Sequence, residues 1–271
     1  MITSLRNPLV KQIRKLHRTK GRREQNLFLL EGTHSLETAC QVDCSLDCLC
    51  YTYEWQIRYP QLWELASQKA QRIELVSPEV LQAMATTVNP DGVIATAIRL
   101  AINEPQIINF QLGLVLERLQ DPGNLGTIIR TALATEVQGI WLSSESVEID
   151  NPKVLRSSAG AWFHVPLIVK SNLSSIIKNY QAKGVQVIAT LPTATKTYWE
   201  LDFTKPSLIL LGNEGAGLSE YLANLANQTV SIPQEKKVES LNVAIVCALL
   251  LYERQRQIRS DKNYKLMICP D

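Results

Sequence analysis

Three apolar segments in the second half of the chain lead directly into turns that carry small and polar residues. They read LGLVLERLQDPGNLG from Leu112, LILLGNEGAGL from Leu208 and VSIPQEKKVESLN from Val230. A strand that ends in such a turn exposes backbone N–H and C=O groups, and α/β proteins build ligand sites at these strand ends. The polar side chains available there to orient a ligand or stabilise a charge are Asn124, Arg130, Glu214, Ser240 and Asn242.

The second turn is rich in glycine, with Gly212, Gly215 and Gly217. Glycine permits backbone conformations that other residues avoid, but a loop of this composition is by itself weak evidence of a ligand. A nicotinamide-dependent enzyme would carry its glycine fingerprint after the first strand of its unit, with a ribose-binding acid further on. The late position of this loop therefore disfavours a dinucleotide site.

In this order, the three segments resemble the motifs of the SpoU/TrmH family of RNA ribose 2′-O-methyltransferases, members of the SPOUT class, from about Leu112 to Arg256. The resemblance implies methyl transfer from S-adenosyl-L-methionine to a ribose in structured RNA. Ribosomal RNA is favoured and transfer RNA is the alternative. It also implies a homodimer with the site completed near the dimer interface. Finally, it implies a C-terminal helix that threads a loop into a trefoil knot, which ordinary topology rules would forbid.

The resemblance also assigns roles to individual residues. Arg130, six residues after Asn124, corresponds to the family's catalytic arginine, although an exposed helical arginine without a function is the alternative. Because a guanidinium stays protonated, we expect it to hold phosphate and stabilise a developing alkoxide rather than act as a base. The implied catalytic residues are Arg130, Asn124, Glu214, Ser240 and Asn242. The implied cofactor-binding residues are Thr190, Leu191, Gly212, Asn213, Gly217, Ile232 and Leu241, with main-chain atoms at Ile232 and Leu241 reading the adenine.

The third segment departs from the family pattern after Ile232 and Pro233. The family usually has Met next and Gly two residues beyond, whereas this chain has Gln234 and Lys236, followed by Lys237. Loss of a glycine constrains the loop if the backbone there needs a positive φ, while the lysines offer phosphate contacts. The departure keeps open a second hypothesis, a non-catalytic RNA-binding or assembly protein on the same fold.

The elements that must position these residues alternate along the second half of the chain. Apolar runs predict strands at Leu112–Arg118, Gly139–Leu142, His164–Ile168, Val185–Thr190, Ser207–Leu211 and Thr229–Ile232. Amphipathic runs predict helices near Gly126–Thr135, Leu173–Lys183, Ser219–Ala226 and Ser240–Ile258. In the last helix the expected buried stripe is Leu241, Ile245, Ala248 and Tyr252. The alternation predicts an α/β fold with a mostly parallel sheet covered on both faces.

The first half predicts a smaller α/β unit. The phrases ITSLRNPLVKQIRKL and FLLEGTHSLETA resemble the ribosomal-protein-like substrate-binding domain that precedes the catalytic domain in many family members. With a linker at Asn103–Phe110, we expect an RNA substrate-binding domain over 1–104 and a knotted methyltransferase domain over 105–271.

Residues 1–23 form a basic segment, with eight Lys or Arg residues and no acid in a chain whose net charge is +2. Val10, Ile13 and Leu16 fall on one helical face and the charges on another. Basic helices bind phosphate backbones, although a merely solvated face is the alternative. The RNA-contacting candidates are Lys11, Arg14, Lys15, Arg18 and Arg22.

The cysteines do not indicate a metal site. The spacing of Cys40, Cys44, Cys48 and Cys50 is not one that closes a tetrahedral zinc site. The alternation Cys44, Leu46, Cys48, Cys50 predicts one core-facing side of a strand, and the three histidines are scattered, so we expect no metal. No apolar run reaches transmembrane length and the N-terminus lacks a signal-peptide core. We therefore expect a cytoplasmic protein without a membrane partner.

Overall fold

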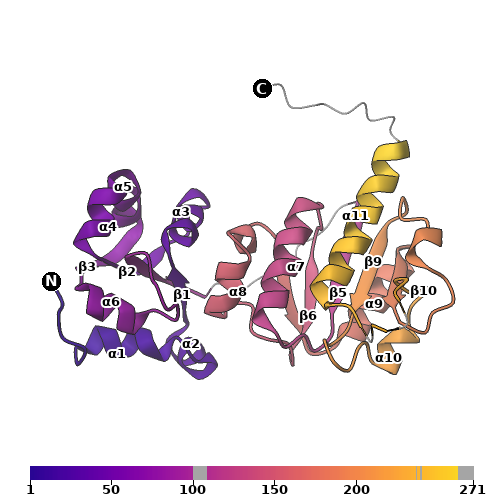
Figure 1. Cartoon of the computed structure of the whole chain (residues 1–271), viewed down its shortest axis with the longest axis horizontal. Helices are drawn as coiled ribbons and strands as arrows, with labels where there is room; N and C mark the ends of the chain where they lie inside the picture. The colour runs from indigo at the N-terminus through magenta and orange to yellow at the C-terminus, as the bar shows by residue number, and fades with distance from the viewer. Residues whose placement is uncertain (100–108, 236, 239, 262–271) are drawn as a thin grey trace. The chain divides into compact units, whose positions relative to one another are not determined.

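The computed structural model describes residues 1–99, 109–235, 237, 238 and 240–261 (Figure 1). Contacts divide the chain into two compact units: Met1–Ala101 with Glu148–His164, and Ile102–Val147 with Val165–Asp271. The segment Glu148–His164 thus belongs with the N-terminal unit, although it lies far along the chain. Most of the linker expected at Asn103–Phe110 lies outside the described residues.

The N-terminal unit is built on a mixed four-stranded sheet in the order β1-β4-β2-β3. Only β2 and β3 are parallel, and β4 runs antiparallel to both of its neighbours. The strands are β1 (Leu27–Glu31), β2 (Leu46–Tyr51), β3 (Ala70–Leu75) and β4 (Val93–Ile98). The helices are α1 (Pro8–Lys15), α2 (Thr19–Gln25), α3 (Thr33–Gln41), α4 (Tyr53–Arg58), α5 (Pro60–Lys69), α6 (Pro78–Met84), α8 (Pro152–Ser157) and the short η1 (Ala161–Phe163).

The cysteine strand corrects one prediction about side-chain direction. A register shift between Leu46 and Cys48 breaks the simple alternation along β2. Cys48 and Cys50 therefore pack in the cluster that includes α1 and α6, whereas Leu46 packs in the opposite cluster with α3 and α5. Leu46, Cys48 and Cys50, which were expected on one face of the strand, therefore lie on its two opposite faces. The cysteines of the described residues are free thiols, and no group of His, Cys, Asp and Glu among those residues could hold a metal.

The second unit is built on a six-stranded sheet in the order β10-β8-β9-β5-β6-β7, with every neighbouring pair parallel. Its strands are β5 (Leu112–Leu116), β6 (Ile140–Ser143), β7 (Leu167–Lys170), β8 (Gln186–Thr190), β9 (Ser207–Leu211) and β10 (Gln228–Val230). Its helices are α7 (Pro122–Ala134), α9 (Leu173–Ala182), the short η2 (Tyr198–Glu200), α10 (Glu220–Ala223) and α11 (Val243–Asp261). The predicted α/β class with a mostly parallel sheet is confirmed.

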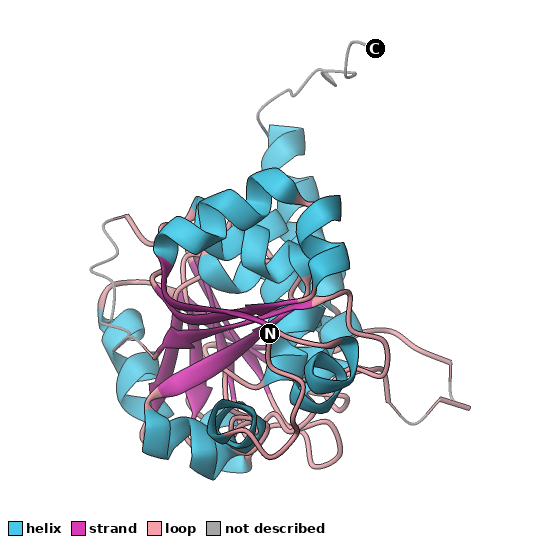
Figure 2. Ribbon diagram, turned by 90° about the vertical axis from the view of Figure 1, so that its left-hand side faces the viewer, coloured by secondary structure: helices cyan, strands magenta, loops and turns pink. Residues whose placement is uncertain are grey.

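The central strands of this sheet are buried. In Figure 2, which views the chain from the side of the N-terminal unit, helices lie above and below the strands. Every residue of β5 and β9 is buried, as expected for parallel strands with both faces covered. On one face α9 packs through Ile176, Ile177 and Tyr180 onto a core that includes Trp141. Elsewhere in the unit α7 packs along α11 (Figure 1). No helix in the described part of the chain is both long and apolar enough to cross a membrane. The trefoil knot stays a prediction.

The C-terminal helix begins later than expected and buries a different face. It starts at Val243 because the Asn242 side chain caps it by accepting from the Ala244 amide at 2.9 Å. Ile245 and Tyr252, expected to be buried, are 51% and 57% exposed. The buried apolar residues are instead Val243, Ala244, Cys247, Leu250 and Leu251. A helix that is apolar around most of its circumference gives no periodic signal that selects one face.

A second boundary was also wrong. The strand expected from His164 begins at Leu167, and the residues just before it, Ala161–Phe163, form η1. Gly160 precedes this turn at a φ of +83°, a conformation that ends helix and strand alike. The short helices α4 and α8 were not predicted. Each has 6 residues, which is less than two helical turns and too short to show a helical periodicity of apolar residues.

Candidate active site

The polar residues of the three segments meet at the carboxyl ends of β5 and β9, which are neighbours in the sheet. β5 leads through Glu117–Asp121 into α7, and β9 leads into the loop Gly212–Ser219. Ligand sites of parallel α/β sheets lie at such ends, where loops from neighbouring strands converge. The third segment joins them through the N-terminus of α11.

Glu214 receives hydrogen bonds from the β5–α7 turn. Its carboxylate accepts from the Asp121 amide at 2.9 Å, the Gln120 amide at 3.1 Å and the Asn124 side-chain amide at 3.1 Å. Burial alone would raise the pKa of this carboxyl, but the donors from Asp121, its own backbone, Asn124 and Gln120 outweigh it and lower the pKa below 4.5. Glu214 is therefore a fixed anion that holds two loops together.

Asn124 links Glu214 to the third segment by hydrogen bonds. Its side-chain oxygen accepts from Asn242 Nδ2 at 2.8 Å, while its own Nδ2 donates to Glu214. Asn242 uses its side-chain oxygen to cap α11. One continuous chain of hydrogen bonds thus joins Glu214, Asn124 and Asn242, which are drawn from three segments up to 118 residues apart. We call these three residues the polar relay.

The glycine loop has a steric reason for its composition. Asn213 and Gly217 pair through two main-chain hydrogen bonds, of 3.0 and 2.9 Å, which fold the loop back on itself. A Cβ at Gly212 would lie 2.0 Å from the Leu218 nitrogen, so no side chain fits there. Gly217 has a φ of +68°, whereas Gly215 would meet only Asn213 Oδ1, at 3.7 Å. The first and last glycines are thus required by the fold and the middle one is not.

Asn213 fixes the same loop from within. Its side-chain oxygen accepts from the Gly215 amide at 2.9 Å and the Ala216 amide at 2.8 Å. Its Nδ2 donates to the Arg118 carbonyl at 2.8 Å, across to the end of β5. The side chain and the main-chain groups of Asn213 are thus both used in shaping the loop.

The remaining cofactor candidates come from neighbouring strand ends. Thr190 ends β8, and its buried Oγ1 has no hydrogen-bond partner among the described residues. Leu191 follows it and bonds through its amide to the Val230 carbonyl at 2.9 Å, at the end of β10. Ile232 and Leu241 are half-buried, and their main-chain groups make no hydrogen bond with another described residue. An unpaired buried hydroxyl and free main-chain groups are what an absent polar ligand would satisfy.

Two of the five catalytic candidates lie outside the polar relay. Arg130 is exposed on α7, and its side chain makes no hydrogen bond or ion pair with another described residue. Six residues along a helix place it about 9 Å from Asn124 along the axis and a third of a turn away. Ser240 is exposed and is not the helix cap, a role that falls to Asn242. Gln234 is exposed, and Lys236 lies outside the described residues.

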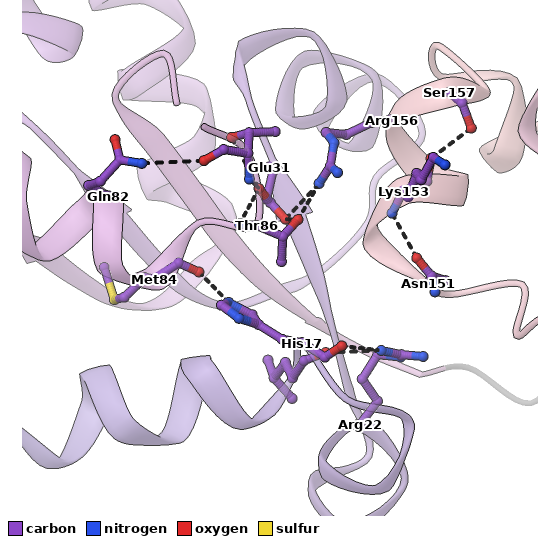
Figure 3. A network of polar contacts seen from close by, with 12 residues as sticks. His17, Arg22, Glu31, Gln82, Met84, Thr86, Asn151, Lys153, Arg156 and Ser157 are labelled. Atoms are coloured by element: carbon purple, nitrogen blue, oxygen red, sulfur yellow. Dashed lines mark hydrogen bonds and ion pairs between the residues drawn. The ribbon is translucent and has the colours of Figure 1, made fainter. Parts of the chain in front are cut away.

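Four of the five RNA candidates are exposed on the N-terminal unit, namely Lys11, Arg14, Lys15 and Arg18. Arg22 is the exception, at 1% exposed. Its Nε contacts Asp150 Oδ1 at 3.3 Å, its Nη1 donates to the Leu16 carbonyl at 3.0 Å, and its Nη2 pairs with Glu148. Figure 3 shows this side chain turned toward His17. A buried arginine held by two carboxylates does not reach RNA, so the prediction for Arg22 was wrong.

The sequence reasoning missed several groups that hold the site. Glu117, directly after β5, accepts from the Ser219 amide at 2.7 Å and so ties the glycine loop to the central strand. The main-chain amides of Gln120 and Asp121 anchor Glu214. An acid placed directly at the end of an apolar run was a usable signal for Glu117, but main-chain donors leave no trace in a sequence.

The comparisons with known proteins agree with this architecture. The family model described as the SpoU rRNA Methylase family matches residues 111–252, and the one described as the MRM3-like substrate binding domain matches residues 7–95. The chain belongs to the SpoU rRNA methylase family and carries an MRM3-like substrate-binding domain before it.

Individual relatives cover nearly the whole chain. An uncharacterized tRNA/rRNA methyltransferase of Synechocystis sp. is 49% identical over 94% of this chain and 93% of its own length. The 23S rRNA (guanosine(2553)-2′-O)-methyltransferase RlmP of Bacillus subtilis is 32% identical over 93% of this chain and 97% of its own. The crystal structure of an AdoMet-bound rRNA methyltransferase from Sinorhizobium meliloti matches with a TM-score of 0.82 at 32% identity, covering 95% of this chain and 97% of that one.

Proposed function

We propose that this protein transfers a methyl group from S-adenosyl-L-methionine to a ribose 2′-hydroxyl of RNA, with ribosomal RNA as the substrate class. The observation that carries the proposal is the polar relay, which joins Glu214, Asn124 and Asn242 at adjoining strand ends of a SpoU-family chain. The relatives' names point to ribosomal RNA, since RlmP of B. subtilis is named as a 23S rRNA ribose methyltransferase.

The residues at the strand ends fit the cofactor. Thr190 offers a buried hydroxyl without a partner among the described residues, Ile232 and Leu241 offer main-chain groups, and Gly212 keeps the loop close to β9. Aliphatic side chains beside free main-chain donors and acceptors suit an adenine, which is flat and has hydrogen-bonding edges.

When bound, S-adenosylmethionine supplies a methyl group on a sulfonium, so that the C–S bond breaks as the C–O bond forms. The protein must align the hydroxyl oxygen with that carbon. Arg130 stabilises the negative charge that develops on the ribose oxygen. Glu214 is unsuited to be the base, because four donors occupy its carboxylate and its pKa is lowered. The hydroxyl proton leaves to water.

A dimer is part of the same proposal. Ile245 and Tyr252, on the face of α11 that was expected to be buried, are exposed. Together with Ala248 and Leu249 they line a shallow hollow beside Tyr198. An apolar face of this kind is characteristic of an interface. The Ile245→Glu variant should convert a dimer into a monomer in light scattering, while Lys178→Glu, on the solvent-exposed face of α9, should not. A monomeric wild-type protein at tens of micromolar would contradict the dimer.

Two measurements test the enzymatic proposal. Calorimetry should show S-adenosylmethionine or S-adenosylhomocysteine binding to the wild-type protein, and no heat at millimolar ligand would contradict it. Mapping of 2′-O-methyl groups in RNA from cells with and without the gene should then show one ribosomal position lost. A lost position in transfer RNA would instead select the tRNA alternative. Cofactor-free RNA binding with no lost position would select the non-catalytic alternative, which the departure from the family pattern at Gln234 and Lys236 keeps open.

The exposed basic residues of the N-terminal unit supply the proposed RNA grip. Neutralising Lys11, Arg14, Lys15 and Arg18 together should weaken RNA binding without changing cofactor affinity. Each lost phosphate contact should reduce the slope of log K against log salt by roughly 0.7 to 0.9. An unchanged slope would mean that these basic residues are a solvated surface that does not contact RNA. A cytoplasmic site of action completes the proposal, and the free thiols of the described cysteines suit a reducing compartment.

A further inference from the structure

The residue that follows β5 combines an unusual backbone with a cationic side chain. Arg118 has a φ of +52°, in the left-handed region that residues with a side chain seldom adopt. The surrounding loops hold it there. Its amide donates to Ser143 Oγ at 2.8 Å, and its carbonyl accepts from Asn213 Nδ2 at 2.8 Å and Gln120 Nε2 at 3.3 Å. The ends of β6 and β9 thus fix the direction in which Arg118 leaves the central strand.

The guanidinium of Arg118 is not saturated by the protein. Its side chain is 44% exposed, yet its Nε is buried and has no hydrogen-bond partner among the described residues. The nearest carboxylate is Glu117, with Oε2 at 3.9 Å from Nη2. That oxygen already accepts from the Ser219 amide at 2.7 Å, so the ion pair with Arg118 is loose. Several N–H donors of the fork are left for a ligand from outside.

The surroundings of Arg118 indicate what kind of ligand its guanidinium would bind. Asn213 holds the Arg118 carbonyl and stands next to Glu214 of the polar relay. Acidic residues lie around this strand end. Glu117 directly follows β5 and bonds the Ser219 amide, and Glu214 bonds the Asp121 amide. Glu145 accepts from the Gln120 side chain through its main-chain carbonyl. These acidic residues would repel the phosphates of an RNA that approaches its target ribose here. A fixed guanidinium beside them offsets the repulsion, and its planar fork matches phosphate oxygens.

We propose that Arg118 binds a backbone phosphate of the RNA next to the ribose that is methylated. This inference rests on the proposed function. It assigns to this chain a substrate-binding residue in the methyltransferase unit, separate from the basic helix of the N-terminal unit. The competing role for Arg118 is purely internal, as a partial counter-charge for Glu117.

The positive φ of Arg118 allows a substitution that removes the side chain with little effect on the backbone. Arg118→Gly removes the guanidinium at a φ that glycine adopts freely, so the fold should tolerate it. Arg118→Asn serves as a second variant, because asparagine also tolerates this region. Arg118→Lys keeps the charge and loses the fork. Lys178→Ala removes one charge from the exposed face of α9 and is the matched control.

The test measures binding and methylation of unmodified 23S rRNA transcribed in vitro, with S-adenosylmethionine as donor. Arg118→Gly and Arg118→Asn should raise KM for the RNA about tenfold, the typical worth of a charge-assisted hydrogen bond. They should also reduce the salt slope of RNA binding by roughly 0.7 to 0.9. The single-turnover rate at saturating RNA and the affinity for S-adenosylmethionine should stay near wild type. Arg118→Lys should recover the slope and Lys178→Ala should change nothing.

The outcomes separate the two roles. If Arg118→Gly and Arg118→Asn lower the melting temperature but keep the wild-type KM and salt slope, Arg118 is only a counter-charge and the inference is wrong. If they lower the slope only as much as Lys178→Ala does, the effect is general charge and the inference is also wrong. A wild-type protein that neither binds nor methylates the RNA removes the proposed function itself, and that failure is visible before any variant is compared.

Discussion

Replacing Glu214 by glutamine should loosen the site, because the substitution changes the carboxylate into a group that is partly a donor. The carboxylate now accepts from the amides of Gln120 and Asp121, from Asn124 Nδ2 and, at 3.4 Å, from Asn213 Nδ2. Glutamine has one acceptor oxygen. If that oxygen serves Asp121 and Asn124, which share Oε1 in the wild type, the new NH₂ group faces the Gln120 N–H. Two donors then oppose each other and one amide loses its partner.

The size of the effect follows from the kind of hydrogen bond that is lost. A bond to a charged group contributes about 1.5–3 kcal/mol, and an unpaired donor costs about the same. Glu214 is half-buried, so water partly relieves the loss, and we expect about 2 kcal/mol. For a unit of this size that corresponds to roughly 4–8 °C in melting temperature.

The pH dependence has a definite sign. The pKa of Glu214 is lowered from its ordinary value of 4.5, because donors outweigh the opposing effect of burial. The carboxylate therefore contributes stability above about pH 4.5, and the contribution disappears as pH falls through the lowered pKa. The stability difference between wild type and Glu214→Gln should be constant at neutral pH and shrink below about pH 4.5.

Hydrogen exchange measures this most directly. The amides of Gln120 and Asp121 should exchange faster in Glu214→Gln, at neutral pH, than in the wild type. Glu200→Gln is the matched control, since Glu200 accepts from the Thr197 amide at 2.7 Å in another loop of the same unit. That control should leave Gln120 and Asp121 protected. Unchanged exchange at both amides together with an unchanged melting temperature in Glu214→Gln would refute the reasoning.

Three further predictions concern other parts of the structure. Gly212→Ala should destabilise the second unit by about 3 kcal/mol or more and abolish cofactor binding in calorimetry, because the new Cβ would lie 2.0 Å from the Leu218 nitrogen. Gly215→Ala should keep the wild-type stability and cofactor binding. Equal effects of the two substitutions would contradict the loop geometry. Arg22→Met leaves two carboxylates without their buried partner and should cost about 3–5 kcal/mol in denaturant unfolding of the N-terminal unit, while Lys20→Met, which breaks an exposed pair, should cost little. Arg130→Ala should remove most single-turnover activity and leave S-adenosylmethionine affinity intact, and a wild-type rate would exclude Arg130 from the mechanism.

The sequence predicted the second unit well, because parallel strands buried on both faces read as uninterrupted apolar runs. The strand at Ser207–Leu211 is found with the predicted bounds. The helix at the C-terminus was placed but its buried face was not, since its apolar residues surround most of the axis. In β2 the register shift moved Leu46 away from the face of Cys48 and Cys50, and a local irregularity of this kind has no signature in alternation.

The charge pattern misled at Arg22 for a related reason. A count of charges along residues 1–23 treats every arginine as a surface group, but the partners of Arg22 lie 126 and 128 residues away, at Glu148 and Asp150. Arg156 of the same distant segment pairs with the buried Glu31 on β1 at 2.8 Å (Figure 3). The segment Glu148–His164 is therefore attached to the N-terminal unit by ion pairs that local pattern could not foresee.

The candidate site lies beyond the reach of local sequence pattern, although the family resemblance pointed to it. Asn124, Glu214 and Asn242 follow three different strands, and parallel topology alone requires their ends to lie at one edge of the sheet. Which of those ends are neighbours depends on strand order. Here β9 lies beside β5, although β6, β7 and β8 come between them along the chain. Periodicity carries no information about that order, whereas the family resemblance does.

The hydrogen bonds of the polar relay then convert this topology into a fixed arrangement of charge. Each of the two asparagine side chains donates to one neighbour and accepts from another, so that Glu214, Asn124 and Asn242 hold one another in place. Removing any one of the three side chains should consequently disturb the two others. Unfolding free energies measured for paired substitutions should therefore fall short of additivity, and strictly additive values would mean that the three residues act independently.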